Sequence, residues 1–430
     1  MTKRAWWLVI LNLILPGSAQ LIAGNRFIGK VGIWATLGAL IAIGLGLLIN
    51  WISPATMIGL LTNPMSLTVL QSVLIAYCIL WVVLTLDTLR LVRIVKLWPS
   101  ARWAVSILAI TGLVIGLGGA GYAATVAGSA RGAILKIFES QKQIEPPVDG
   151  RYNILLLGGD AGPDRLGLRP DSISVASIDA KTGQLVLIGV PRNTERATFA
   201  KGSPLYGPFP NGYECGDLCL ISYLYTYGQE HPELYPNAVK EGSQPGIEAM
   251  RDAVEGLLGL KLQYFVLIDM QGFADLIDAL GGITLDVPQR TPLAAAIPGS
   301  KPFGWVEAGT QHLNGETALW YSRSRYESTD YSRMSRQRDV QEAILRQFTP
   351  QNVILRFQAV AAAGTQVVKT DIPATMLGPL GDLSIKAKKL PVTRLELVPE
   401  EFNPAYPDLK KISAAIKDAF NPKATSKPTP

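Results

Sequence analysis

The residues with the clearest chemical potential are arginines clustered in the second half of the chain. Five of them fall within the sixteen residues from 323 to 338, and the only acidic residues in or next to this run are Glu327, Asp330 and Asp339. Arg323 and Arg325 share a face if extended, while Arg333, Arg336 and Gln337 share one face of a helix. Arginine forks bind phosphate oxygens, and several converging forks suit a pyrophosphate. The cluster predicts a phosphate site, with a solvated, salt-bridged surface as the alternative.

A second polar cluster occupies the Gly-rich stretch from Gly158 to Ser172. This stretch connects the end of one predicted strand to the start of the next, and it contains Asp160 and Asp171. Carboxylates at the mouth of a sheet can hold Mg²⁺, which keeps some waters and takes further oxygens from phosphate. The alternative is a solvated turn, because Gly, Pro and Asp are ordinary loop residues. Arg192, just beyond a later strand, is predicted to point towards the same edge of the sheet.

Other catalytic chemistries find little support in the sequence. It contains no nucleophile elbow, Walker loop, zinc-binding helix motif or dinucleotide fingerprint. Its two histidines, His231 and His312, are too few and too poorly placed for histidine-based catalysis. Cys215 and Cys219 are the only cysteines after residue 150, and in an oxidising compartment such a pair is expected to form a disulfide. A zinc site is the alternative, and it would need further ligands.

Strands interleaved with helices must position these side chains. The alternation predicts a three-layer α/β/α domain with a mixed central sheet over residues 151–399. Short apolar runs predict strands at Tyr152–Gly158, Ile173–Ile178, Gln184–Val190, Tyr264–Asp269 and Ile283–Val287. Helical spacing occurs in Gly246–Leu258, Gly272–Leu280, Gly315–Ser322, Ser335–Phe348, Asn352–Ala363 and Pro373–Leu380. Residues 400–430 are expected to be a Pro- and Lys-rich, partly disordered tail.

The first 127 residues have the composition of a membrane region. The chain is 48% hydrophobic and 17% charged, too apolar for an ordinary soluble enzyme of its length. Ile33–Trp51, Leu67–Leu86 and Trp103–Val126 are each long enough to cross a bilayer. An earlier apolar stretch, Ala5–Ala23, is interrupted at Pro16-Gly17 and is predicted either to re-enter or to form a fourth span. Residues 128–150 are expected to be a polar linker.

Basic residues orient this region. Residues 1–150 contain 11 basic and four acidic residues, and the rest of the chain contains 29 and 30. The basic excess therefore belongs to loops on the cytoplasmic side, not to a nucleic-acid site. With the basic clusters inside, everything after about Val126 lies outside the cytoplasm. The sequence thus predicts a multi-pass cell-membrane protein with an extracytoplasmic domain and no nucleic-acid partner.

Several motifs occur in order in the second region. They are Asn153-Ile-Leu-Leu-Leu-Gly158 with the following Asp and Arg-x-Asp-Ser, Val190-Pro-Arg192, Gly272–Pro288, His312-Leu-Asn-Gly-Glu-Thr-Ala-Leu319, Arg323-x-Arg325 and Arg333-x-x-Arg336-Gln337. Together these motifs resemble the LytR-CpsA-Psr family of cell-wall glycopolymer ligases, and the resemblance covers about Tyr152 to Pro399.

The resemblance implies a membrane-anchored phosphotransferase. Such enzymes move a glycopolymer, with its phosphate, from a polyprenyl-pyrophosphate carrier to a peptidoglycan hydroxyl and leave a phosphodiester. Carried over by motif, Asp160 and Asp171 would hold Mg²⁺ and Arg169 would assist the incoming hydroxyl. The residues implied to clamp the pyrophosphate are Arg192, Arg323, Arg325, Arg333 and Gln337.

Two features depart from the family pattern, and two other functions stay open. Asn193 follows Pro-Arg where many members have Asp, and the loop Thr198–Asp217, whose last residues include Cys215, could shape acceptor or polymer choice. An apolar stripe that includes Phe265 and Ile277 is either ordinary core or the border of a prenyl tunnel. The alternative functions are hydrolysis of a polyprenyl pyrophosphate and a non-catalytic regulator that binds the lipid carrier.

Overall fold

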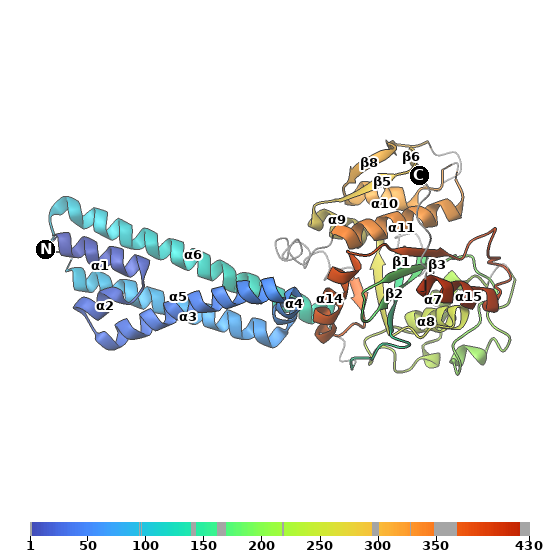
Figure 1. Cartoon of the computed structure of the whole chain (residues 1–430), viewed down its shortest axis with the longest axis horizontal. Helices are drawn as coiled ribbons and strands as arrows, with labels where there is room; N and C mark the ends of the chain where they lie inside the picture. Colours follow the sequence, from blue (N-terminus) through green and yellow to red (C-terminus); the bar gives the residue numbers. More distant parts are fainter. Residues whose placement is uncertain are drawn as a thin grey trace. The chain divides into compact units, whose positions relative to one another are not determined.

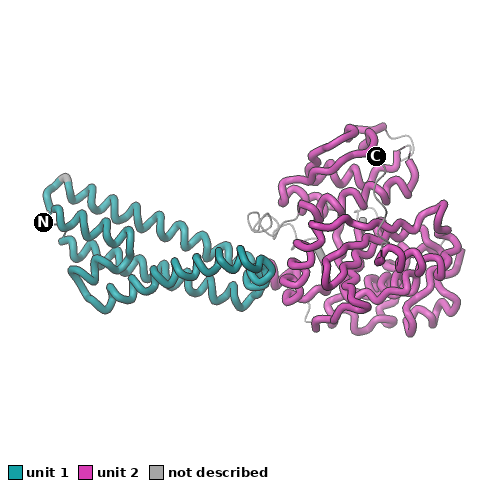
Figure 2. The backbone as a smooth tube through the Cα atoms, viewed as in Figure 1, with its two compact units in different colours: residues 1–132 teal, residues 133–430 magenta. Residues whose placement is uncertain are grey.

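The chain folds into two units, residues 1–132 and residues 133–430 (Figure 2). A computed structural model describes residues 2–93, 95, 97–138, 143–160, 169–216, 219–294, 301–326, 328–347 and 368–421 (Figure 1). The expected helix Asn352–Ala363 and the loop residues 161–168 lie outside these described residues. Each unit is considered by itself.

The first unit is entirely helical in its described part. Its helices are α1 (Thr2–Ile14), α2 (Ser18–Ala23), α3 (Arg26–Ile52), α4 (Pro54–Thr62), α5 (Pro64–Val92) and α6 (Pro99–Ile137). Three stretches are long and apolar enough to cross a membrane: Arg26–Ile52, Pro64–Val92 and Ala101–Ile137. They contain the three expected spans. Helix α6 continues to Ile137, so residues 128–137 of the expected linker are helical.

The interruption at Pro16-Gly17 separates α1 from α2. Gly17 adopts a φ of 101°, and a Cβ there would lie 2.6 Å from the carbonyl oxygen of Gly29 in α3. The fully buried Gln20 amide donates to the carbonyl of Leu84 at 2.7 Å and to the hydroxyl of Thr88 at 2.9 Å, both in α5. Close glycine contacts and hydrogen bonds between helices thus hold the broken segment against α3 and α5.

The second unit is built around a mixed six-stranded sheet. Its strand order is β10-β3-β2-β1-β4-β9, with parallel pairs β1–β4 and β10–β3 and antiparallel pairs elsewhere. The strands are β1 (Arg151–Asp160), β2 (Arg169–Asp179), β3 (Leu185–Val190), β4 (Tyr264–Asp269), β9 (Val368–Thr370) and β10 (Thr393–Glu396). Both β1 and β2 extend beyond the expected strands towards the Gly-rich loop that joins them.

Side chains alternate between the two faces of the sheet and fill two cores. Leu155 and Leu157 of β1 face a core formed with α7 (Leu224–Glu230), α8 (Pro245–Leu258) and α15 (Leu409–Phe420). Ile154 faces the opposite core, where α14 (Leu377–Ala387) packs. Helices therefore cover both faces, which confirms the α/β/α domain with a mixed sheet (Figure 1).

A third core lies beside the sheet. It joins α9 (Met270–Leu280), α10 (Gly315–Arg323) and α11 (Asp330–Gln347) to two small sheets. These sheets pair β5 (Ile283–Val287) with β8 (Gly309–Leu313) and β6 (Thr291–Leu293) with β7 (Gly304–Val306). Short 3₁₀ helices lie at Pro204–Tyr206, Ile221–Tyr223, Pro232–Leu234 and Ala374–Met376. The expected apolar stripe is divided, because Phe265 lies in the first core and Ile277 in the third.

Other expected boundaries also differ in the structure. Helix α11 begins at Asp330, five residues before the predicted Ser335, because polar residues of its first turn hid the helical pattern. The helix predicted at Pro373–Leu380 is the 3₁₀ turn Ala374–Met376 followed by α14. The Pro- and Lys-rich tail after residue 399 contains α15, a helix that the sequence pattern did not predict. This helix is rich in lysine, but Ile412 and Ile416 point into the first core and Asp408 caps its first turn.

A buried ion pair ties α8 to the segment that follows β9. The Arg251 guanidinium donates to Asp371 at 2.6 Å, and their side chains are 8% and 1% exposed. The other oxygen of Asp371 accepts the backbone N–H of Phe265 in β4 at 2.7 Å. Asp371 therefore satisfies both a buried cation and a strand amide, and without it Arg251 would keep only a longer 3.5 Å contact with Glu248.

We expect Asp371→Ala to destabilise the second unit by about 3 kcal/mol, because it leaves the buried Arg251 charge with only the longer contact to Glu248. Pulse proteolysis of the full chain in detergent across a temperature series measures the unfolding transition. Its midpoint temperature should fall by roughly 6–12 °C. Asp382→Ala is the matched control, since its pair with Lys386 is 40% and 43% exposed. Equal stability of the two variants would contradict the role of the buried pair.

Candidate functional site

The β1–β2 hairpin places the backbone of Asp160 and Asp171 at the same end of these two strands. Its register pairs Gly158 with Ser172 and Asp160 with Arg169, and an irregularity between Gly158 and Gly159 shifts the strands. Asp171 is therefore two residues from the position opposite Asp160. The side chain of Asp171 is 17% exposed, while that of Asp160 lies outside the described part of the structure.

Asp330 is the point at which the predicted arginines meet. Its Oδ1 lies 3.6 Å from Arg192 Nε and 3.8 Å from Arg325 Nη1, and its Oδ2 lies 3.0 Å from Arg333 Nη2. Arg192 also donates through Nη1 to the carboxylate of Asp171, and Arg333 donates to the Asp171 carbonyl at 3.1 Å. The structure thus brings Asp171, Arg192, Arg325 and Arg333 together.

Different elements supply these side chains. Arg192 follows the buried strand β3, and Arg325 belongs to the link between α10 and α11. Arg333 lies one turn into α11, at i+3 from Asp330. Because the groups come from a strand end, a link and a helix, their convergence depends on the tertiary fold.

The balance of positive and negative side chains in this cluster favours the binding of an anion. Burial lowers the pKa of the Arg333 guanidinium, Asp330 and Asp171 act in the opposite direction, and Arg192 and Arg325 lower the pKa further. Three guanidinium groups therefore share two carboxylates, and Arg333 is only 4% exposed. A partly buried site with this balance suits phosphate oxygens, which accept from several arginine forks at once.

Three other predicted residues lie on neighbouring segments. Arg323 is the last residue of α10, with its guanidinium carbon 5.1 Å from the centre of the Trp320 ring. Gln337 donates to the Ser322 carbonyl at 3.4 Å, and its Oε1 is buried without a hydrogen-bond partner in the described structure. The guanidinium carbon of Arg169 lies 4.7 Å from the centre of the Tyr223 ring. Their roles at the site stay predictions.

The remaining arginines of the run are part of the framework. Arg336 donates to the main-chain carbonyls of Tyr321, at 3.0 Å, and Ser324. Arg338 is 1% exposed and pairs with Glu396 of β10 at 3.0 Å. In the sequence, Asp330 is one of the acidic residues that interrupt the arginine run. Its i,i+3 spacing from Arg333 is the local signal that these two side chains meet on a helix.

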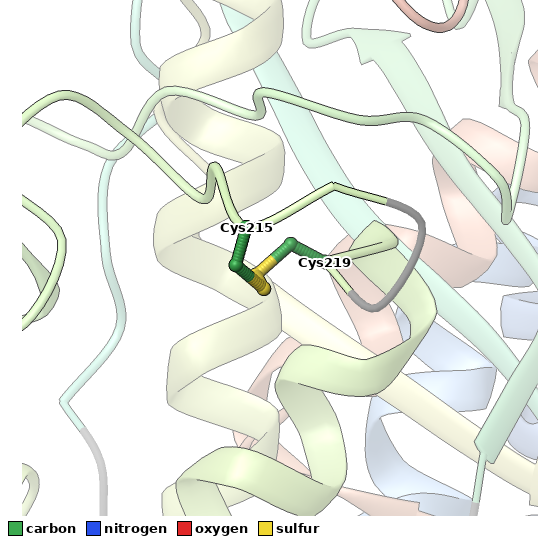
Figure 3. Close-up of a disulfide and its surroundings, with 2 residues drawn as sticks. All are labelled: Cys215 and Cys219. Carbon is green, nitrogen blue, oxygen red and sulfur yellow. A yellow bond between two sulfur atoms is a disulfide. The ribbon is translucent and has the colours of Figure 1, made fainter.

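A disulfide joins Cys215 and Cys219, with Cα atoms 5.1 Å apart (Figure 3). The sulfurs are bonded to each other, so they are not zinc ligands in this structure. The residues that follow contact the site, because Ile221 donates to the Thr194 carbonyl at 2.8 Å and Ser222 donates to the Arg192 carbonyl at 3.3 Å. The disulfide therefore restrains the segment that contacts the backbone at Arg192.

The described residues contain no group of three or more His, Cys, Asp or Glu side chains close enough to hold a metal. Mg²⁺ needs fewer protein ligands, since it keeps waters and shares phosphate oxygens. Asp171 offers the hard oxygen donors that this ion prefers, and the hairpin register places Asp160 nearby. A magnesium ion held at Asp160 and Asp171 together with a phosphate ligand stays a prediction.

Comparison with known proteins gives a consistent picture. The sequence profile of the LytR_cpsA_psr family matches residues 124–405. A curated Bacillus subtilis relative, polyisoprenyl-teichoic acid–peptidoglycan teichoic acid transferase TagU, is 27% identical over 276 residues, which are 62% of this chain and 77% of TagU. The corresponding B. subtilis TagV is 27% identical over 209 residues, 48% of this chain and 46% of TagV.

The crystal structure of B. subtilis TagV aligns with a TM-score of 0.45 and 21% identity, covering 64% of this chain and 98% of that chain. The family profile spans the β1–β2 hairpin, Arg192, Asp330 and the arginines around it. This chain therefore belongs to the LytR-CpsA-Psr family.

Proposed function

We propose that this protein is a membrane-anchored, extracytoplasmic phosphotransferase. It transfers a glycopolymer with its phosphate from a polyprenyl-pyrophosphate carrier to a hydroxyl of peptidoglycan. The single observation that carries the proposal is the convergence of Arg192, Arg325 and Arg333 around Asp330 and Asp171. The family relationship and the names of its teichoic acid transferase relatives support it.

The reaction exchanges a phosphoanhydride bond of the carrier for a phosphate ester bond to the acceptor. The acceptor oxygen forms a bond to the phosphorus that carries the polymer, the bridging P–O bond of the pyrophosphate breaks, and prenyl phosphate leaves. The acceptor hydroxyl gives up its proton to solvent. Such a transfer asks the protein mainly to position groups and neutralise charge, so a site without a covalent nucleophile is sufficient.

The residues of this chain divide that work. Arg192, Arg325 and Arg333, with Arg323 and Gln337, bind the pyrophosphate oxygens and neutralise the charge that develops on the leaving phosphate. Arg169 orients the incoming hydroxyl. Mg²⁺, held by Asp160 and Asp171, would supply additional positive charge at the pyrophosphate.

The membrane region keeps the domain near its substrate. The three long apolar helices anchor the chain in the bilayer that holds the lipid carrier. Anchoring raises the effective concentration of a substrate confined to the same membrane. The convergence of the arginines supports a pyrophosphate site, because scattered positions would leave the pyrophosphate without a clamp.

Arg325→Ala is expected to lower the rate of transfer by about a hundredfold, the usual loss when one stabilising donor is removed from a reacting centre. Arg323→Ala should lower it similarly if that side chain joins the clamp. Arg290→Ala is the control, because Arg290 is exposed and pairs with Glu307 on the β6–β7 side of the domain. The rate is measured with a lipid-linked polymer and peptidoglycan. Full activity in a folded Arg325→Ala variant would refute the proposed clamp.

Asp171→Asn is expected to raise the Mg²⁺ concentration needed for half-maximal transfer by at least about tenfold, because an amide is a weaker ligand than a carboxylate. A magnesium titration of the transfer rate measures this, with Asp382→Asn as a surface control. An unchanged magnesium requirement would remove Asp171 from the metal site.

The acceptor distinguishes transfer from hydrolysis. With peptidoglycan present, we expect a phosphodiester between polymer and peptidoglycan, and without it little release of polymer phosphate. Mass spectrometry of the products, with and without acceptor, makes the comparison. Release of polymer phosphate at the same rate in both reactions would favour the polyprenyl-pyrophosphate hydrolase instead.

A further inference from the structure

Asp330 holds a position that the proposed transfer does not explain. It is the first residue of α11, and its carboxylate contacts arginines that reach it from three segments. The proposed pyrophosphate would use the same three guanidinium groups. A carboxylate at that point has the same sign of charge as the ligand and shares its donors.

The cluster needs a counter-charge when no anion is bound. Arg192 and Arg325 are about one-third exposed, at 28% and 32%, but Arg333 is almost fully buried. Like charges that meet in a partly desolvated site repel each other, and a buried charge without a partner is costly. Asp330 contacts all three cations and so reduces this repulsion.

The contacts of Asp330 differ in strength. Oδ2 forms a hydrogen-bonded ion pair with Arg333 at 3.0 Å. Oδ1 lies at 3.6 Å and 3.8 Å from Arg192 and Arg325, beyond hydrogen-bond length, and is buried without a hydrogen-bond partner in the described structure. Asp330 therefore holds Arg192 and Arg325 by charge alone, while Arg192 also donates to the Asp171 carboxylate.

We propose that Asp330 is the internal counter-ion of the phosphate site. It holds Arg192, Arg325 and Arg333 in position while the site lacks an anion, and it yields their donors to phosphate oxygens when a pyrophosphate binds. Asp330 is a positioning residue, because it acts through the arginines. The inference rests on the proposed function, since it takes the arginine cluster to be the pyrophosphate site.

A counter-ion of this kind has opposite effects on binding and on turnover. Its negative charge competes with the ligand, so removing the charge strengthens binding of an anion. Its contacts also fix the arginines, so removing it lets them bind the pyrophosphate in less productive positions and slows the transfer. Removing a residue that only stabilises the fold would instead weaken both anion binding and turnover.

Asp330→Asn in the full-length protein tests this with inorganic pyrophosphate as the probe. Isothermal titration calorimetry in detergent should give a Kd about tenfold lower than that of the wild type, a difference of about 1.4 kcal/mol. In the transfer assay, KM and kcat should both fall. Asp330→Glu restores the charge and should return Kd towards the wild-type value. Asp339→Asn is the matched control, because Asp339 lies on the same helix but pairs with Arg394 at 2.7 Å.

The outcomes separate this inference from the proposed function. A wild-type protein that does not bind pyrophosphate would overturn the phosphate site itself. A wild type that binds, with Asp330→Asn binding equally or more weakly, would overturn only the counter-ion role. If Asp330→Asn folds only with pyrophosphate present, the ligand replaces the missing charge, as proposed. If it folds in neither condition, Asp330 is a structural residue and the proposal is wrong.

Discussion

Repulsion among like charges is the constraint on which this site depends. Arg192, Arg325 and Arg333 approach one another closely enough to share the carboxylate of Asp330, and one of them is buried. Such an arrangement persists only if the surrounding structure holds the side chains and supplies counter-charge. The sheet edge, the link between α10 and α11 and the first turn of α11 together provide both.

The framework around α11 is itself made of charged groups. Arg336 fixes the helix to the end of α10 through main-chain carbonyls, and Arg338 fixes it to β10 through Glu396. Burial lowers the pKa of Arg338 and raises that of Glu396, and each partner opposes the shift of the other. Gly189 of β3 leaves room for the Glu396 carboxylate, since a Cβ there would collide with it. One arginine-rich sequence therefore supplies both the anion site and the contacts that position it.

Much of this architecture could be predicted from the sequence, because long apolar runs and helical spacing are local signals. The long apolar helices of the first unit, strands β1 to β5 and helices α8 to α10 follow from such patterns. Strands β9 and β10 have only three and four residues, too few to show an alternating pattern. The sequence of α15 is largely polar, and only the structure shows that its two isoleucines lie in the core.

The site itself was predictable only in part. Residue types pointed to phosphate, but the contact between Arg333 and Asp171 joins residues 162 positions apart. Tertiary packing decides which arginines line the proposed anion site and which donate to main-chain carbonyls. It also decides the role of Asp330.

The most direct test of the central claim is a crystal structure of the protein with a bound prenyl pyrophosphate. The account predicts phosphate oxygens within about 3 Å of Arg192, Arg325 and Arg333, at the point that Asp330 now shares with them. It also predicts that the contacts of Asp330 with Arg192 and Arg325 are lost in that complex. A pyrophosphate bound elsewhere, with the three arginines still gathered around Asp330, would contradict it.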